Sequence, residues 1–472
     1  MVVKFILPAL IEAKERFWRS IKYSLFPPLG LATLAGYLAD DDIAEIIDEH
    51  VEELDTDDHP DLVAIEVYIT SAKRAYKIAD KYRAKGVYVV LGGLHVTALP
   101  EEAARHADTI VTGPAEEAWP RFLADFRKGK AEKLYSSNTR TLAGLPLPRR
   151  DLIAKERYLV PNSIVVSRGC PHGCDFCYSN SFFRGGKHFY TATLDRCLVE
   201  IDRLSGRHLF FLDDNIFGDR EFALELFASM KGMGRVWQGA ATVKSILDDK
   251  LLDAAVQSGL RSLFVGFESL NEQSLLKHGK KHNRVGDYDR AVSMLHKRGV
   301  MINGSFVFGL DADDKTVFKA TSEWAISCGI ETSTFHILTP YPGTDLFNRY
   351  LKSQRIMDFD WDKYDTRHAI FTHPFLSKDE LEEGYWKAYE YFYKWSNILR
   401  SSMSHETFTK RLRHIAYVGA WKKIDPWWAM IIRLKQLKLA VPPLEQLLQG
   451  KGRQNQRKGA RTRVSALHDA AG

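Results

Sequence analysis

The segment Ser163–Ser179, SIVVSRGCPHGCDFCYS, decides the fold, because a short apolar run leads directly into three cysteines. Cys170, Cys174 and Cys177 form a C-x3-C-x2-C array. Three thiolates at this spacing can each hold one iron of a cubane [4Fe–4S] cluster, which ordinarily takes four cysteines. No fourth cysteine lies nearby, so the array predicts a cluster with one open iron, which can bind a small molecule and deliver an electron to it.

A zinc site is the alternative interpretation of this motif, with His172 or His188 as the fourth ligand. Structural zinc sites typically pair one C-x2-4-C motif with a second, distant pair of ligands. The sequence has no such second pair of cysteines, so the iron–sulfur interpretation is favoured. Cys197 and Cys328 lie in helical patterns, and we interpret them as packing thiols because a free cysteine behaves as a small hydrophobe.

Strand-like and helix-like patterns alternate on a long cycle from the cysteine segment onward. Six apolar segments have strand character, at residues 163–167, 208–214, 236–242, 262–269, 301–309 and 332–338. An amphipathic helical pattern precedes or follows each of them. Repeated βα units predict an incomplete, TIM-type (β/α)6 barrel with its functional residues at the carboxyl ends of the strands.

The N-terminal part of the chain alternates strands and helices on a shorter cycle. Five further apolar runs lie at residues 2–8, 43–48, 62–68, 87–93 and 109–112. This pattern predicts a Rossmann-like, flavodoxin-type parallel sheet that is covered by helices on both faces and binds its ligand beyond the strand ends. A G-x-G-x-x-G fingerprint is absent after the first strand, so a dinucleotide is disfavoured.

The predicted domains follow from these patterns. We expect the sheet domain at residues 1–135, a linker at 136–160 and the barrel at 161–345. Residues 346–450 have mainly helical, aromatic-rich patterns and predict a helical extension. Residues 451–472 are rich in lysine and arginine and poor in apolar residues, which predicts a disordered basic tail.

Composition excludes several classes of protein. The chain has 472 residues, 45% of them hydrophobic, and only five cysteines, which disfavours disorder throughout and a disulfide-rich secreted scaffold. No run approaches the roughly 18 apolar residues of a membrane span. The N-terminus is interpreted as a strand and not a signal peptide, so we expect a cytoplasmic protein with reduced thiols.

The positive charge is concentrated at the C-terminal end. The segment from Ser401 to Gly472 contains 14 Lys and Arg but only 4 Asp and Glu, so the net charge of +6 comes from this segment.

The cysteine array followed by six strand ends resembles the radical S-adenosylmethionine (radical SAM) superfamily. The resemblance implies that SAM binds the open iron and is reduced to a 5′-deoxyadenosyl radical. It also implies SAM-site positions at the aromatic residue before the last cysteine and at later strand ends: Phe176, Asp213, Asp214, Glu268, Ser269 and Gly309. Taken alone, the acidic residues would be strand-end caps or salt bridges, but their placement at successive strand ends favours the SAM site.

Residues 27–40 and 91–103 resemble the cobalamin-binding domain of class B radical SAM proteins. The resemblance implies a cobalamin site formed by loops after the strands: Tyr68, Thr70, Ser71, Gly92, Gly93, His95, Thr112 and Gly113. The alternative is that the glycines only serve a turn and that the histidine is an ordinary loop residue. Asp48 and His50 imitate the start of the D-x-H-x-x-G motif, but Glu53 replaces its glycine, so the lower cobalt ligand is unassigned.

Residues 279–284, 336–344 and 361–371 resemble a subgroup that includes hopanoid methylases and bacteriochlorophyll methyltransferases. The resemblance implies cobalamin-dependent methylation of an unactivated carbon in a lipid, tetrapyrrole or secondary metabolite. It further implies a flavodoxin- or ferredoxin-type electron donor. Tyr364, Asp365 and His368 are candidates for the substrate pocket, and equally for a hydrogen-bonded corner that holds the extension on the barrel.

Two alternative functions stay open at this point. One is radical SAM oxidation, rearrangement or cyclisation without methyl transfer, and the other is a corrinoid carrier or sensor with an inert barrel. Aromatic and basic residues near the C-terminus could touch an anionic membrane surface, or could form a helix packed on the barrel: Trp421, Lys422, Lys423, Trp427, Trp428, Arg433, Lys435 and Lys438. No folded nucleic-acid reader motif is present, so no nucleic-acid partner is expected.

Overall fold

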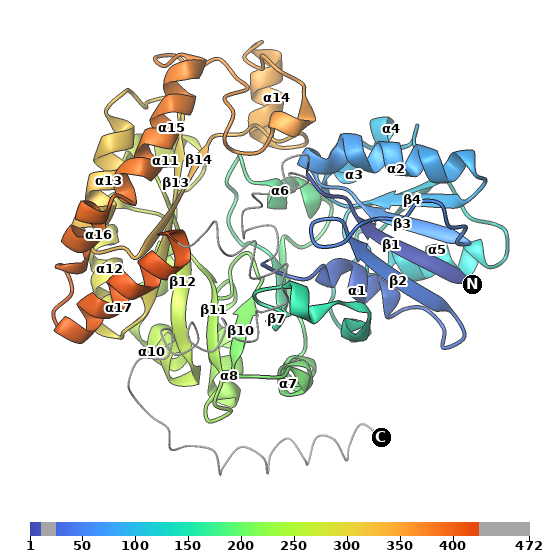
Figure 1. The fold of residues 1–472 in the computed structure, drawn as a ribbon, viewed down its shortest axis with the longest axis horizontal. Helices are drawn as coiled ribbons and strands as arrows, with labels where there is room; N and C mark the ends of the chain where they lie inside the picture. Colours follow the sequence, from blue (N-terminus) through green and yellow to red (C-terminus); the bar gives the residue numbers. More distant parts are fainter. Residues whose placement is uncertain (11–24, 424–472) are drawn as a thin grey trace.

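The computed structural model describes residues 1–10 and 25–423, which form two α/β units and a layer of helices (Figure 1). The N-terminal unit and the barrel each contain a six-stranded sheet, and the C-terminal helices cover the far flank of the barrel. The predicted basic tail and the residues from Trp427 to Lys438 lie outside the described residues. No helix within the described ranges is long and apolar enough to cross a membrane.

The N-terminal sheet has the strand order β2-β1-β3-β4-β5-β6, and all its strand pairs are parallel. Its strands are β1 (Val2–Leu7), β2 (Ile43–Asp48), β3 (Leu62–Glu66), β4 (Tyr88–Gly92), β5 (Thr109–Thr112) and β6 (Leu134–Ser136). Its first five strands have the flavodoxin order, which confirms the predicted fold class. The edge strand β6 was not predicted, because it has only three residues and begins where the pattern had faded.

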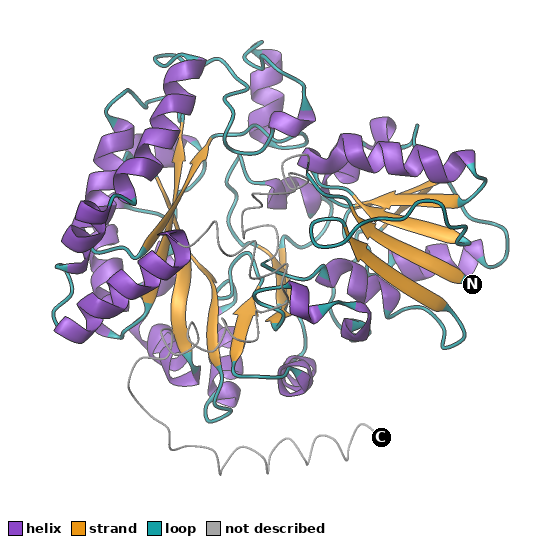
Figure 2. Ribbon diagram, viewed as in Figure 1, coloured by secondary structure: helices purple, strands orange, loops and turns teal. Residues whose placement is uncertain are grey.

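Helices cover both faces of this sheet, as Figure 2 shows. They are α1 (Leu29–Ala35), α2 (Ala72–Ala84), α3 (Leu94–Ala98), α4 (Pro100–Ala103) and α5 (Ala118–Phe126). The sheet has a hydrophobic core on each face, and successive residues of β3 point into opposite cores. Leu62 and Ala64 pack with α1 and α5, whereas Val63 and Ile65 pack with α2. Because strands of this sheet are buried on both faces, their sequences are continuous apolar runs.

The barrel sheet has the order β14-β13-β12-β11-β10-β7, again with parallel pairs throughout. Its strands are β7 (Ser163–Ile164), β10 (His208–Phe211), β11 (Val236–Ala241), β12 (Leu260–Glu268), β13 (Met301–Phe308) and β14 (Thr332–Ile337). The sheet is open, which confirms the predicted incomplete barrel. Its helices are α7 (Leu194–Arg203), α8 (Arg220–Met230), α9 (Val243–Ile246), α10 (Asp249–Ser258), α11 (Glu272–Lys277), α12 (Tyr288–Lys297) and α13 (Val317–Ser327).

The cysteine segment is inserted between β7 and α7. A small antiparallel hairpin, β8 (Ser167–Gly169) and β9 (Phe189–Thr191), encloses it together with α6 (Tyr178–Phe182). The sequence patterns did not predict the hairpin, because each of its strands has three residues. The hairpin closes the base of the cysteine loop.

The C-terminal extension consists of α14 (Asp345–Lys352), α15 (Lys378–Phe392), α16 (Trp395–Ser402) and α17 (Phe408–Val418). Helix α15 begins with a capping box between Ser377 and Glu380. The hydroxyls of Tyr389 and Tyr393 accept hydrogen bonds from backbone N–H groups of β14, at 3.0 and 2.9 Å. These bonds satisfy backbone groups along the edge of the open sheet, so the extension protects an edge that would otherwise be exposed.

Trp237 anchors the barrel core. Its side chain is fully buried between Phe211 and Phe227, with ring centroids 5.2 and 5.1 Å away, and its indole N–H donates to the Ser258 hydroxyl at 2.9 Å. We expect Trp237→Ala to lower the free energy of unfolding by about 3–5 kcal/mol, because it leaves a large cavity. Urea unfolding followed by circular dichroism measures the effect.

Trp386 on α15 provides the matched control, because 52% of its surface is exposed. Trp386→Ala should change the free energy of unfolding by no more than about 0.5 kcal/mol. Equal destabilisation by the two variants would contradict the assigned core.

Candidate functional site

A cavity of ≈ 590 Å³ lies between the N-terminal unit, the cysteine segment and the extension. The loops after β1, β2, β3 and β4 line it from the N-terminal unit. Tyr178, which directly follows the last cysteine of the array, lines it from the barrel side, and Tyr341 and Tyr364 line it from the segments after β14. The cavity therefore lies at the carboxyl ends of strands from both sheets, where parallel α/β folds bind ligands.

The cysteine loop is fixed in place by backbone constraints and by ion pairs. Gly169 has φ +79°, and a Cβ there would lie 2.0 Å from the carbonyl oxygen of His188, so only glycine fits immediately before Cys170. The Asp175 carboxylate, between the second and third cysteines, pairs with His278 at 2.9 Å and with Arg349 of α14 at 2.7 Å. Both the barrel and the extension therefore hold this loop.

The three thiols fit a cluster better than a single ion. Within the described part of the chain, no set of three potential ligand atoms that includes their sulfurs lies within 4.8 Å of one another. A cubane spreads its cysteines over three irons, whereas one zinc ion would draw the sulfurs together. Burial raises the pKa of Cys174 to about 11 and that of Cys177 to about 12, so the thiolate forms depend on a positively charged partner such as iron.

The remaining cysteines lie where the helical patterns predicted. Cys197 is buried in α7 within the barrel core. Cys328 ends α13, and its thiol donates to the Asp289 carboxylate at 3.4 Å. Neither residue lies near the cysteine array in the sequence, and both have local packing or hydrogen-bonding roles.

The two aspartates after β10 have different environments. Asp213 is buried and accepts hydrogen bonds from the Val166 N–H at 3.2 Å and from the Ser167 hydroxyl at 2.5 Å. Burial raises the pKa of Asp213 to about 7 despite these bonds. Its role in the structure is to hold the chain that enters the cysteine loop. Asp214 accepts a hydrogen bond from the Tyr178 hydroxyl at 2.8 Å. Since Tyr178 lines the 590 Å³ cavity, Asp214 lies close to that cavity.

Glu268 ends β12 in a left-handed conformation, with φ +65°. The strand register shifts between Gly266 and this residue, so the pairing with β13 is irregular here. Its carboxylate forms an ion pair with the buried ammonium of Lys280. Strained backbone of this kind at a strand end is typical of functional sites.

The other candidate SAM-site residues follow the same strand ends. Ser269 is buried, and its hydroxyl accepts from the Asn271 N–H at 3.0 Å. Gly309 has φ +89° and donates its N–H to Asp313 at 2.9 Å. The ring of Phe176 contacts that of His278 edge-on at 6.1 Å. Phe176 therefore lies in the cysteine loop, and Ser269 and Gly309 lie at the ends of β12 and β13. Their part in binding SAM stays a prediction.

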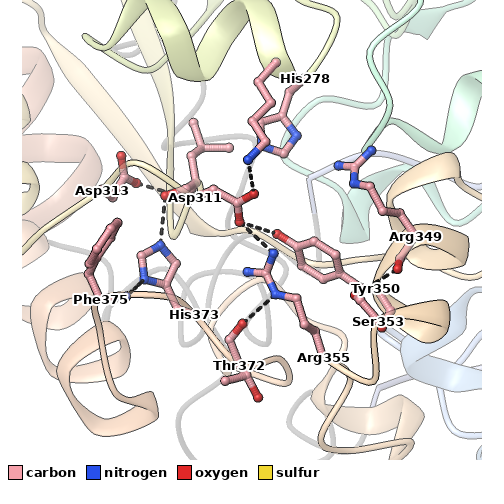
Figure 3. Close-up of polar contacts among 12 residues, drawn as sticks. His278, Asp311, Asp313, Arg349, Tyr350, Ser353, Arg355, Thr372, His373 and Phe375 are labelled. Atoms are coloured by element: carbon pink, nitrogen blue, oxygen red, sulfur yellow. Dashed lines mark hydrogen bonds and ion pairs between the residues drawn. The ribbon is translucent and has the colours of Figure 1, made fainter.

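Hydrogen bonds also tie α14 to the end of β13, as Figure 3 shows. Asp311, three residues after the end of β13, accepts from Tyr350 of α14 at 3.1 Å and pairs with Arg355 at 2.8 Å. His373 contacts the carbonyl oxygen of Leu310 at 2.8 Å through its Nε2. The extension therefore supports the strand ends as well as the cysteine loop.

The predicted cobalamin residues divide between two cavities. Tyr68, Thr70, Ser71 and His95 line the 590 Å³ cavity. The glycines line a second cavity of ≈ 110 Å³, which lies between α1 and the ends of the N-terminal strands: Gly92, Gly93 and Gly113. Thr112 belongs to β5 and is not among the lining residues of either cavity.

Gly93 is required by the fold itself. It has φ +107°, and a Cβ there would lie 3.0 Å from the backbone of Val67. Gly92 has no such restriction, since a Cβ would meet only ordinary contacts with Val111. The turn therefore explains Gly93 without a ligand, which was the alternative interpretation.

The charged residues of the smaller cavity were not predicted from the sequence. Glu66, Glu116 and Arg168 line it, and the Arg168 guanidinium pairs with Glu116 at 3.1 Å across the two domains. The Nε of this arginine is buried without a hydrogen-bond partner. In the sequence, the only local indication that Arg168 belongs to the site is its position two residues before Cys170. Buried polar groups beside a glycine-lined cavity are suited to a polar ligand such as a nucleotide tail.

The predicted substrate-pocket residues lie at the rim and wall of the larger cavity. Tyr364 is fully buried and Asp365 lines the cavity beside it. His368 contacts Asp365 at 3.0 Å but is not among the lining residues. Arg367, which was not predicted, lines the cavity and pairs with Asp365 at 3.1 Å. The segment is thus both a cavity wall and a hydrogen-bonded corner.

Comparison with known proteins agrees with this geometry. Residues 164–325 match the radical SAM superfamily, and residues 22–123 match the B12-binding domain. The chain is 33% identical over 353 residues to bacteriochlorophyllide d C-12(1)-methyltransferase of Chlorobaculum tepidum, covering 72% of this chain and 76% of the relative. This chain belongs to the B12-binding radical SAM family.

One further relative is similar in sequence, and one solved structure shares the fold. Bacteriochlorophyllide d C-8(2)-methyltransferase of Chlorobaculum tepidum is 29% identical over 377 residues, covering 75% of this chain and 83% of the relative. The fold is shared with the radical SAM methyltransferase TsrM of Kitasatospora setae, solved with cobalamin and a [4Fe–4S] cluster, at a TM-score of 0.65 and 14% identity. That match covers 92% of this chain and 99% of TsrM.

Membership in this family establishes that the chain is an enzyme with a [4Fe–4S] cluster, SAM and cobalamin as cofactors. The residues present fit these groups. The cysteine loop has three buried or partly buried thiols and no fourth, and the N-terminal strand ends carry a glycine-lined cavity next to a larger one. The two cavities and the cysteine loop adjoin one another, because Phe182 of α6 lines both cavities.

We expect Cys177→Ala to abolish the cluster, because its thiolate is one of only three available ligands. Iron content and the absorbance of the anaerobically reconstituted protein measure the loss. Cys328→Ala is the matched control, and it should retain full iron content, since this thiol lies outside the loop. Unchanged iron in Cys177→Ala, or equal loss in both variants, would contradict the assigned ligands.

Proposed function

We propose that the protein is a cobalamin-dependent radical SAM methyltransferase that adds a methyl group to an unactivated carbon of a large, apolar cyclic molecule, with a tetrapyrrole as the first candidate. The observation that carries the proposal is the 590 Å³ cavity shared by the cobalamin-binding domain and the barrel. The two methyltransferase relatives described above are named for bacteriochlorophyllide d, a tetrapyrrole.

The proposed roles follow the geometry of the site. Cys170, Cys174 and Cys177 hold the cluster. SAM contacts the residues around the cysteine loop and strand ends: Phe176, Asp214, Glu268, Ser269 and Gly309. Cobalamin binds against the N-terminal strand ends, with its nucleotide tail in the cavity lined by Gly92 and Gly113. These groups supply radical formation and methyl transfer when bound, and the protein supplies positioning and exclusion of water.

The walls of the shared cavity indicate the class of substrate. Leu94, Phe182, Tyr341, Pro342 and Tyr364 provide apolar and aromatic surface. Ligand cavities are typically ~300–1,000 Å³, lined mainly by such side chains with a few polar groups that fix orientation. The Asp365–Arg367 pair provides those polar groups here. An apolar ring system with a small number of polar substituents matches this lining.

We further propose a low-potential electron donor of the flavodoxin or ferredoxin type, since reduction of SAM requires an external electron. A cytoplasmic location fits the reduced thiols of the cluster.

Contact with a membrane surface is a further proposal. It is supported by exposed apolar side chains on α16 and α17 and between them: Trp395, Leu399, Met403, Phe408 and Leu412. Such a surface would bring the enzyme to lipid-borne substrates.

The test of the function uses protein loaded with the cluster and hydroxocobalamin, dithionite, SAM and a chlorophyllide-type tetrapyrrole. We expect 5′-deoxyadenosine together with a product about 14 Da heavier, or about 17 Da heavier when the SAM methyl group is trideuterated. Liquid chromatography with mass spectrometry detects both. The Cys177→Ala protein should form neither compound.

Three other results would overturn parts of the proposal. Absence of 5′-deoxyadenosine from fully loaded protein would contradict radical chemistry. Formation of 5′-deoxyadenosine with loss of two hydrogens from the substrate and no added methyl group would show the oxidative or cyclising alternative instead. Failure to bind hydroxocobalamin would contradict the methyl-transfer route.

A further inference from the structure

A cluster of histidines and one glutamate lies away from the cofactor cavities, at the opposite end of the barrel. Glu331 directly precedes β14, and His296 lies in the last turn of α12. His405 lies between α16 and α17, and His414 belongs to α17. The cluster therefore joins two barrel elements to the extension, at the amino-terminal ends of the strands.

Three residues of this cluster have distances that match ligands around one ion, because the ligand atoms of His296, Glu331 and His405 all lie within 4.8 Å of one another. The Nε2 atoms of His296 and His405 lie 3.4 and 3.7 Å from the two carboxylate oxygens of Glu331. The Nδ1 of His414 lies 3.0 Å from the Nε2 of His405, which is a hydrogen-bond distance, so His414 is a neighbour of this group and not a member of it. Zinc bonds of ~2.0–2.2 Å in a tetrahedral site place neighbouring ligand atoms ~3.3–3.5 Å apart. The two separations from Glu331 are longer than good hydrogen bonds, which are ~2.7–3.2 Å.

Burial also suits a metal. Glu331, His405 and His414 are at least nine-tenths buried, and His296 is half-buried. Imidazole nitrogens and carboxylate oxygens in such a site are the ligands that zinc takes in proteins.

The surroundings leave room for an ion and orient the ligands. A cavity of ≈ 20 Å³ lies among the four side chains, and about 10–15 Å³ is enough for one water-sized occupant. The backbone N–H of Ile302 donates to Glu331 Oε2 at 2.9 Å, which fixes the carboxylate. The cationic neighbours Lys410 and Arg413 donate to the carbonyls of His296 and Gly299, at 3.1 and 3.3 Å.

We propose that His296, Glu331 and His405 form a binding site for one divalent first-row transition metal ion, with zinc as its best-fitting occupant. Two imidazoles and one carboxylate supply three ligands of a tetrahedral shell and leave the fourth position open to water. The ion fastens the α16–α17 connection to the barrel, and His414 of α17 contacts His405 beside it. This inference does not depend on the proposed methyl transfer, because none of its residues lines the cofactor cavities.

The test measures metal binding by the cluster-loaded protein, so that the cysteines are occupied by iron. After equilibration with Zn²⁺ and removal of free metal, elemental analysis should find about one zinc per chain beside the cluster iron. His405→Gln should weaken zinc binding by about tenfold or more, with unchanged iron. His59→Gln, at an exposed histidine outside the cluster, should keep the zinc.

X-ray absorption at the zinc edge identifies the ligands directly. We expect nitrogen and oxygen neighbours at ~2.0–2.1 Å and no sulfur at ~2.3 Å. If this buried substitution prevents folding, His296→Gln at the half-buried edge provides the same comparison. No zinc uptake by the wild-type protein, uptake that these substitutions leave unchanged, or a sulfur-containing shell would each overturn the proposal.

Discussion

Parallel strands place all their carboxyl ends along one edge of a sheet, and this geometric constraint organises the whole enzyme. Here two parallel sheets turn those edges toward a common cavity of ≈ 590 Å³. Loops from β1, β2, β3 and β4 line it on one side, and the segment after Cys177 lines it on the other. Cofactors bound by separate domains can therefore act on one substrate in a space that excludes bulk water.

The cysteine loop needs support from several elements, because a short loop that carries three thiols has little core of its own. Asp213 holds its entrance, Gly169 permits its backbone path, and Asp175 connects it to the barrel and to α14. The Arg168–Glu116 pair joins the same region to the N-terminal domain. The extension thus supports the reacting centre as well as covering the edge strand β14, and its removal would disturb both.

Much of this architecture could be predicted because its signals are local. The cysteine spacing and the apolar strands are visible within a few residues, and they sufficed for both domains. Strands β6, β8 and β9 were missed because three residues carry no periodic pattern. The Arg168–Glu116 pair and the cluster around Glu331 depend on residues far apart in sequence, which only the fold brings together. For His368 the sequence left open a place in the substrate pocket or in a hydrogen-bonded corner, and its side chain contacts Asp365 outside the cavity lining.

Electron paramagnetic resonance tests most directly whether the two cofactor sites open onto one cavity. In the cluster- and cobalamin-loaded protein at low potential, cob(II)alamin and the reduced cluster both carry unpaired electrons. We expect the cob(II)alamin signal to be split or broadened by the nearby reduced cluster, and this effect to disappear in Cys177→Ala. A cob(II)alamin spectrum identical in the two proteins would contradict the shared cavity.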